Sequence, residues 1–88
     1  MRNPGILIFI SAGSGMVVVQ HDDGFAVMEL LGDEGLLERG DSLVGDWDTL
    51  GGEDIRSSRL ARTLSVYVQG SWGSREHAIR VARNTGGG

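Results

Sequence analysis

Two apolar segments on either side of a polar turn form the clearest pattern in the chain. They are residues 16–21, Met-Val-Val-Val-Gln-His, and residues 24–31, Gly-Phe-Ala-Val-Met-Glu-Leu-Leu. Between them, Asp22 and Asp23 tolerate turn geometry, and Gly24 adopts a positive φ without strain. The pattern predicts a β-hairpin that turns at these three residues.

The two faces of the second hairpin strand differ in polarity. Strand alternation puts Phe25 and Val27 on the same side as the charged Glu29, opposite Ala26 and Met28. Either another element covers Phe25 and Val27, or they are exposed to a ligand. Coverage by the N-terminal strand or a C-terminal helix is the favoured interpretation, because a small barrel has few apolar residues to spare.

Four further segments have strand patterns. Residues 6–10 are a continuous apolar run, typical of a strand that is covered on both faces or hidden in an oligomer. Residues 42–48 and 63–69 alternate between apolar and polar positions, and residues 53–57 are interpreted as a short strand that pairs back with Ile55 inward. The residues predicted to face inward are Leu43, Gly45, Trp47, Ile55, Leu64, Val66 and Val68, whereas Tyr67 faces outward.

Turn residues predict the connections. Residues 1–5 are interpreted as a frayed lead-in, and residues 70–74 as a loop. Residues 32–39 are interpreted as a loop in which Leu36 and Leu37 turn inward.

A helix is predicted over residues 75–84. Ser74 is a suitable N-cap, Glu76 stands in the first turn, and Arg80 and Arg83 lie toward the end, where the helix dipole favours cations. The apolar stripe that would pack on the barrel consists of Ala78, Ile79 and Ala82.

Together these elements predict a mainly β protein. We expect a small β-barrel of five or six strands, OB-like or SH3-like, with one short C-terminal α-helix. Residues 1–84 would form a single domain and residues 85–88 a flexible glycine tail. A length of 88 residues with 15 glycines and 1 proline fits one core with many tight turns.

Composition excludes several kinds of chemistry. The chain has no cysteine, which excludes disulfides, thiol nucleophiles and cysteine-ligated zinc. All 8 basic residues are arginine, which excludes lysine Schiff bases and the lysine of a Walker loop. The apolar runs are far shorter than the roughly 20 residues of a membrane span, and no secretory-signal pattern is present. We therefore expect a cytoplasmic protein with no membrane contact.

Two segments contain residue types that occur in ligand sites, but their sequence context favours a structural role. Residues 11–15 contain Gly-Ser-Gly, but a phosphate-binding loop must open a helix, and here a β-branched segment follows. His21, Asp22 and Asp23 carry atoms that ligate metals, but turn formation already accounts for both aspartates. We expect no catalytic residue, no metal and no cofactor.

Charge divides the chain into an acidic and a basic part. Residues 1–54 carry 11 acidic residues and 2 arginines, and residues 55–88 carry 6 arginines and 1 acidic residue, which gives the net charge of −4. One interpretation is that the two parts neutralise each other within the fold or across a dimer. The other is a basic patch that binds a polyanion.

A basic patch of this kind would suit binding of single-stranded nucleic acid. The arginines of the final third lie near Tyr67 and Trp72, and such sites combine guanidinium groups for phosphates with rings on which bases stack. An acidic protein binds nucleic acid only if its arginines gather on one face.

The segment from Gly15 to Leu30 resembles the opening hairpin of S1-like domains of the OB-fold group, in its valines and its Asp-Gly-Phe-Ala-Val sequence. Gly40 and Asp41, and residues 54–59, are similar to the third and fourth strands of that family. The resemblance covers about residues 15–60. It implies binding of RNA or single-stranded DNA on the barrel face, which would map onto Phe25, Arg56 and Arg59.

Two functions follow as expectations. The first is a non-catalytic binding or interaction module that engages a protein partner or associates with itself through residues 6–10. The alternative is a single-stranded RNA- or DNA-binding module. Its candidate residues are Phe25, Arg56, Arg59, Arg62, Tyr67 and Trp72.

Overall fold

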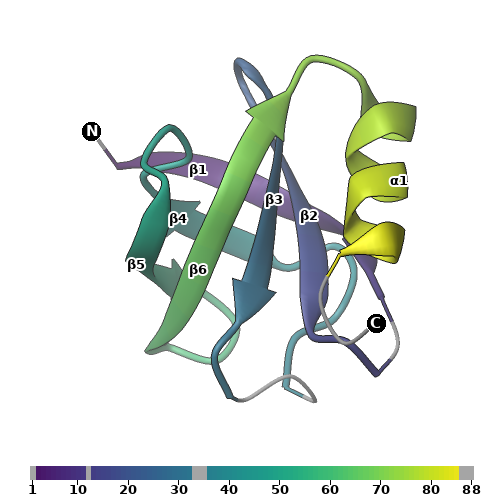
Figure 1. Cartoon of the computed structure of the whole chain (residues 1–88). Helices are drawn as coiled ribbons and strands as arrows, with labels where there is room; N and C mark the ends of the chain where they lie inside the picture. The colour runs from purple at the N-terminus through teal and green to yellow at the C-terminus, as the bar shows by residue number, and fades with distance from the viewer. Residues whose placement is uncertain (1, 12, 33–35, 86–88) are drawn as a thin grey trace.

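The computed structural model describes residues 2–11, 13–32 and 36–85. Across these residues the chain forms six β-strands and one α-helix (Figure 1). The strands are β1 (Asn3–Ile10), β2 (Met16–His21), β3 (Gly24–Leu30), β4 (Ser42–Gly45), β5 (Gly51–Ser57) and β6 (Arg62–Trp72), and the helix is α1 (Arg75–Asn84). The strands close into an antiparallel barrel in the order β1, β2, β3, β6, β5, β4, with β4 paired back to β1. The predicted mainly β barrel with one short C-terminal helix is confirmed. Within the described ranges, no helix is long and apolar enough to cross a membrane.

The predicted hairpin is confirmed as β2 and β3. Its register pairs Val17 with Met28 and Val19 with Ala26, and all four side chains are buried. At the turn, Gly24 has a φ of +147°, and a Cβ atom here would lie 2.5 Å from the backbone O of Trp72. Glycine is therefore required where the hairpin meets the end of β6.

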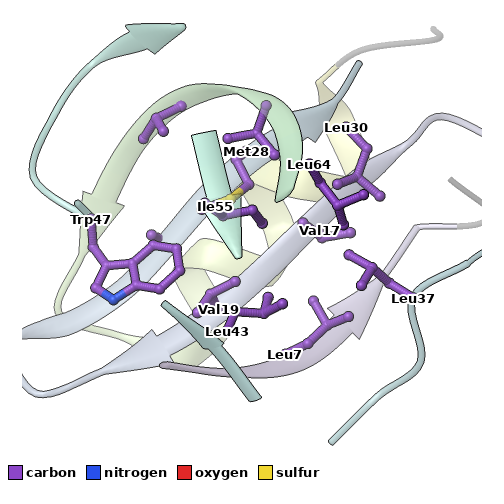
Figure 2. Packing of buried hydrophobic residues seen from close by; sticks show 13 residues of the cluster. Leu7, Val17, Val19, Met28, Leu30, Leu37, Leu43, Trp47, Ile55 and Leu64 are labelled. Atoms are coloured by element: carbon purple, nitrogen blue, oxygen red, sulfur yellow. The ribbon is translucent and has the colours of Figure 1, made fainter. Parts of the chain in front are cut away.

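The barrel interior is filled by side chains from all six strands (Figure 2). Trp47 is 2% exposed, and its Nε1 donates a hydrogen bond to the backbone O of Pro4 at 3.4 Å. Every residue that alternation predicted to face inward on residues 42–48, 53–57 and 63–69 is buried, and Tyr67 faces outward. The buried members of this core are Leu7, Val17, Val19, Ala26, Met28, Leu30, Leu37, Leu43, Trp47, Ile55, Leu64, Val66 and Val68.

A second apolar cluster lies outside the barrel, beneath α1. Ala78 and Ala82 of the helix are fully buried and share this cluster with Met16, Val18 and Val27. Phe25, Trp72 and Ile79 are partly buried against it. The predicted helical stripe is confirmed, and so is the predicted coverage of Phe25 and Val27, which α1 provides.

The bounds of α1 match the prediction. Ser74 is the N-cap, and its side chain accepts a hydrogen bond from the backbone N of His77 at 3.3 Å. Glu76 in the first turn and Arg83 in the last turn suit the helix dipole. Thr85 follows as the C-cap, and residues 86–88 of the predicted tail lie outside the described residues.

Several strand boundaries differ from the prediction. Residues 3–5 were expected in a frayed lead-in but belong to β1, because they pair with residues 43–45 of β4. Residues 70–72 were expected in a loop but continue β6, because they pair with residues 25–27 of β3. A register shift between Val27 and Met28 lets β6 carry one extra residue, Gln69, past this point. The predicted strand over residues 42–48 ends at Gly45.

Two predictions of burial were wrong for one residue each. Leu37 is buried, as expected, but Leu36 is 38% exposed, and its backbone O accepts a hydrogen bond from Arg59. In β1, Leu7 is buried and Ile8 and Phe9 are partly buried against the cluster beneath α1, but Ile6 is 43% exposed. The predicted coverage of residues 6–10 on both faces is therefore wrong for Ile6 alone, and burial of this strand in an oligomer stays a prediction.

Candidate functional site

The outer surface of the barrel divides into a covered part and an uncovered part. Helix α1 packs over β2 and the beginning of β3, and the cluster beneath it also includes Ile8 and Phe9 of β1 and Trp72 of β6 (Figure 1). Three paired strand segments lie outside this contact: the second half of β3, the part of β6 before Trp72, and β5. Among the described residues, no helix covers their outer side. This uncovered side is the candidate site.

Tyr67 stands at the centre of the uncovered side. Strand register places it opposite Glu29 of β3 and opposite Gly52 of β5. Its side chain is 48% exposed. A Cβ atom on Gly51 would lie 4.0 Å from Cε2 of Tyr67, and one on Gly52 would meet nothing within 4 Å. Because both β5 neighbours lack side chains, the ring stays open to solvent.

Two exposed leucines stand at the ends of the strands that neighbour Tyr67. Leu31 directly follows β3, donates its backbone N–H to the O of Ser65 at 3.0 Å and is 53% exposed. Leu50 directly precedes Gly51 and is 70% exposed. A single exposed leucine is ordinary, but three large exposed apolar side chains on or next to three paired strands suggest a contact surface.

Acidic groups accompany these apolar groups. Glu29 is half-buried beside Tyr67, and Asp54 is exposed two positions along β5 from Gly52. Asp54 Oδ1 accepts a hydrogen bond from Ser65 Oγ at 3.3 Å. We call the surface made of Glu29, Leu31, Leu50, Asp54 and Tyr67 the Tyr67 face.

The loop between β4 and β5 adds negative charge near this face. Hydrogen bonds from the Thr49 side chain and then from the Asp48 N–H hold the pKa of Asp46 below its ordinary value of 3.8. The carboxylate of Asp46 therefore stays ionised at neutral pH. On β5 itself, Arg2 offsets part of the negative charge, since its guanidinium lies 3.9 Å from Glu53 and donates to the backbone O of Asp54 at 3.0 Å.

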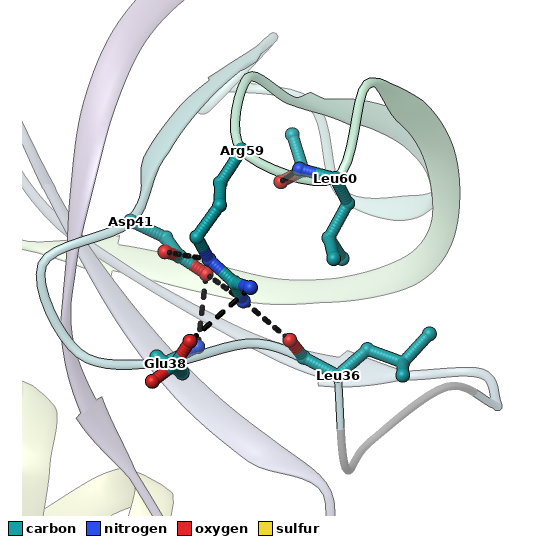
Figure 3. A network of polar contacts seen from close by, with 6 residues as sticks. Leu36, Glu38, Asp41, Arg59 and Leu60 are labelled. Carbon is teal, nitrogen blue, oxygen red and sulfur yellow. Dashed lines mark hydrogen bonds and ion pairs between the residues drawn. The ribbon is translucent and has the colours of Figure 1, made fainter.

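Arg59 forms a polar cluster at another part of the barrel (Figure 3). Its Nε and Nη2 donate to the two carboxylate oxygens of Asp41 at 2.8 and 3.0 Å, and its Nη1 lies 3.1 Å from Glu38. Asp41 is 6% exposed and also accepts from the backbone N of Glu38 at 2.9 Å. The hydrogen bonds from Arg59 lower the pKa of Asp41, against the effect of burial. The cluster ties the loop before β4 to the turn between β5 and β6, and it pairs one arginine of the basic part with two carboxylates of the acidic part.

The six residues predicted for nucleic-acid binding do not form one surface. Phe25 and Trp72 are a cross-strand pair, half-buried next to α1, and the Trp72 ring centre lies 6.0 Å from that of His77. Arg59 is held by Asp41. The other three are on β5 and β6: Arg56 and Tyr67 point outward, whereas Arg62 shares its strand row with the inward Leu64.

His21 is engaged on both ring nitrogens. Nε2 lies 2.9 Å from Ser71 Oγ, and Nδ1 accepts from the backbone N of Asp23 at 3.3 Å. Its ring stacks on Trp47 with the ring centres 6.2 Å apart. In the part of the chain that the structure describes, no group of three or more His, Cys, Asp or Glu residues could hold a metal ion.

Of the five residues of the Tyr67 face, only Tyr67 was predicted from the sequence as a site residue. The other four could not be predicted because they depend on the order of strands in the barrel. Alternation along a strand shows which way a side chain points but not which strand lies beside it. The sequence of Gly51 and Gly52 predicts a turn, whereas both glycines sit in β5 and leave the Tyr67 ring uncovered.

Comparison with models of known protein families found no match, and neither curated proteins nor solved structures gave a significant match. The resemblance to S1-like domains stays a prediction, and the function is argued from the residues themselves.

Proposed function

We propose that this domain is a non-catalytic protein-interaction module whose contact surface is the Tyr67 face. The observation that supports it is the half-exposed Tyr67 in the middle of a sheet side that no described helix covers. Tyrosine is enriched at interface centres because its ring buries a large apolar area with little loss of side-chain entropy.

The composition of the Tyr67 face fits this role. Leu31 and Leu50 can be desolvated around the ring, and Glu29 and Asp54 supply charged groups for specificity. The face is the outside of a closed barrel, so it presents side chains outward and encloses no substrate. Such a surface suits contact with another macromolecule better than catalysis.

Site-specific photo-crosslinking in cells that produce the protein tests this proposal. A photoreactive phenylalanine derivative replaces Tyr67 in one sample and Asp23, exposed at the hairpin turn, in the control sample. We expect a discrete protein product from position 67 that unlabelled wild-type protein suppresses. A Tyr67→Ala competitor should need a concentration about 10-fold higher for the same suppression, as a lost interface centre predicts. Identical products from both positions, or equal competition by Tyr67→Ala, would contradict the proposal.

One observation favours binding of single-stranded nucleic acid as a second candidate. Arg56 is exposed and points outward from β5, paired with Thr63, which shares its strand row with Tyr67. A guanidinium and a ring on one strand ribbon are groups that bind phosphate and stack a base. This candidate ranks second because Glu29 and Asp54 on the same side repel phosphates.

A titration with fluorescently labelled single-stranded RNA and DNA oligonucleotides tests the second candidate. Saturable anisotropy at low salt that weakens steeply with added salt, and weakens again in Arg56→Ala, would support it. The matched control is Arg75→Ala, since Arg75 is exposed on α1 and away from the Tyr67 face. Absence of binding at low salt would rule this candidate out.

A further inference from the structure

Helix α1 carries a surface whose chemistry complements the Tyr67 face. Its outward side has an open hollow of about 470 Å³, lined by Glu76, Ile79, Arg80, Arg83 and Asn84. Arg83 lies over the Phe9 ring, 5.5 Å from the ring centre, and Arg80 is exposed. The hollow therefore combines the apolar side chain of Ile79 with two guanidinium groups and the one carboxylate of Glu76, so that positive charge is in excess.

The two surfaces match in charge and in kind of contact. The Tyr67 face offers a protruding ring with the carboxylates of Glu29 and Asp54 close by. A guanidinium interacts favourably with the face of a tyrosine ring and pairs in a forked geometry with carboxylates. Ile79 in the hollow would pack against the apolar face of the Tyr67 ring.

The two surfaces also match in size. A helix of 10 residues is about 15 Å long. Three neighbouring strands span about 10 Å from the first axis to the last. One helix therefore covers the width of the ribbon formed by β3, β6 and β5.

These surfaces cannot meet within one molecule. Strand β5 and helix α1 lie on opposite sides of the barrel (Figure 1). Contact between them therefore requires two copies, with the helix of one copy on the sheet of the next. Such a contact joins two different surfaces and is a head-to-tail, or heterologous, association.

We infer that the Tyr67 face binds α1 of a second copy of this chain, with Arg80 and Arg83 of one copy facing Glu29, Asp54 and Tyr67 of the other. This inference rests on the proposed function and names its partner. The −4 net charge is compatible with it, because the contact joins an acidic surface to a basic one. The association is weak, since one helix on three strands buries less than a standard interface.

Sedimentation velocity on the full chain tests the inference. Wild type is measured from about 10 µM to about 1 mM, the range of weak association. Salt is raised from about 0.1 M to about 1 M, which shortens the Debye length from about 10 Å to about 3 Å. We expect concentration-dependent association with a dissociation constant at least about 10-fold higher at the higher salt.

Two charge-reversed variants identify the surfaces. The helix variant is Arg80→Glu with Arg83→Glu, and the sheet variant is Glu29→Arg with Asp54→Arg. Each variant keeps one surface and reverses the charge of the other, so each alone should stay monomeric. An equimolar mixture should associate, because surfaces of opposite charge then meet again. Arg75→Glu, which changes α1 outside the hollow, is the control that should associate like wild type. Circular dichroism and thermal unfolding confirm that each variant is folded, and Tyr67→Ala replaces the sheet variant if that one fails to fold.

Three results would overturn the inference: a monomeric wild type at all concentrations and low salt, association that both variants retain, or a mixture of folded variants that forms no complex. Its failure differs from failure of the proposed function. If wild type stays monomeric while position 67 crosslinks to a protein other than the 9.4 kDa chain itself, only the inference fails. If position 67 gives no specific product and association persists in Tyr67→Ala, the proposed function fails.

Discussion

At Gly5 the backbone of β1 approaches the core so closely that a methyl group has no room. A Cβ atom here would lie 2.5 Å from Cγ1 of Val19 and 3.0 Å from Cζ2 of Trp47. Gly5 pairs with Leu43, so this contact lies at the seam where β1 and β4 close the barrel. The absent side chain lets the indole lie against the strand backbone.

We therefore expect Gly5→Ala to lower the free energy of unfolding by about 1 to 3 kcal/mol, as overpacking of a core does. Urea denaturation followed by circular dichroism measures the change. Gly52→Ala is the matched control, since a Cβ atom there meets nothing within 4 Å. The control should shift the free energy by less than about 0.5 kcal/mol. Equal losses in both variants would contradict this account of the seam.

The ion pair between Asp41 and Arg59 gives a second prediction at the residue scale. Asp41→Asn keeps the shape of the side chain and removes its charge. Because Asp41 is buried but the Arg59 side chain is 42% exposed, we expect a loss of about 1 kcal/mol at neutral pH. Thermal unfolding measures it, and Asp48→Asn, at an exposed position, is the control.

The pH dependence of this loss follows from the direction of the pKa shift. Folding lowers the pKa of Asp41 below 3.8, so the carboxylate stabilises the fold above that value, and this contribution disappears as the pH falls through the folded pKa. The difference between wild type and Asp41→Asn should be constant between about pH 5 and 8 and should shrink below about pH 4. A difference that grows on acidification would show that Asp41 is not stabilised as its charged form.

At the scale of the element, Ser74 fixes the start of α1. Its side chain accepts from the N of His77, one of the backbone groups that a helix start leaves without an acceptor. We expect Ser74→Ala to cost about 1 kcal/mol and to speed hydrogen exchange of the first helical turn. Ser58→Ala, at an exposed position in the turn after β5, should change neither quantity. Unchanged exchange in Ser74→Ala would contradict the capping role.

Elements with local signals could be predicted from the sequence. The hairpin turn at Asp22, Asp23 and Gly24 and the helix after Ser74 are both encoded within a few residues, and both are confirmed. Strand alternation likewise gave the inward side of β6, with Val66 and Val68 buried.

Features that depend on distant partners could not be predicted. Gly70 and Ser71 have weak strand propensity, but they extend β6 because β3 offers hydrogen-bonding partners. Proximity in the sequence groups Arg59 with Arg56, although Asp41 binds Arg59 across the fold. The Tyr67 face depends on the pairing of β6 with both β3 and β5, which no single segment of the sequence specifies.

At the scale of the whole molecule, strand pairs that are distant in sequence close the barrel. Gly5 pairs with Leu43, and Met28 pairs with Val68. Because loops must close before these contacts form, we expect folding on a time scale of roughly milliseconds to seconds. Stopped-flow refolding followed by tryptophan fluorescence measures it, since Trp47 becomes buried on folding. Folding within microseconds would contradict a barrel closed by such pairs.

The central proposal is that the uncovered sheet side of one copy contacts α1 of a second copy of this chain. Amide NMR spectra of the wild-type chain at low and high concentration test it most directly, because each amide reports on its own surroundings. We predict shifts that grow with concentration for residues 29–31, 50–54 and 65–67 and for residues 76–84 of α1, and that disappear in the Tyr67→Ala variant. Shifts confined to β1 and β2, or spectra that do not change with concentration, would contradict it.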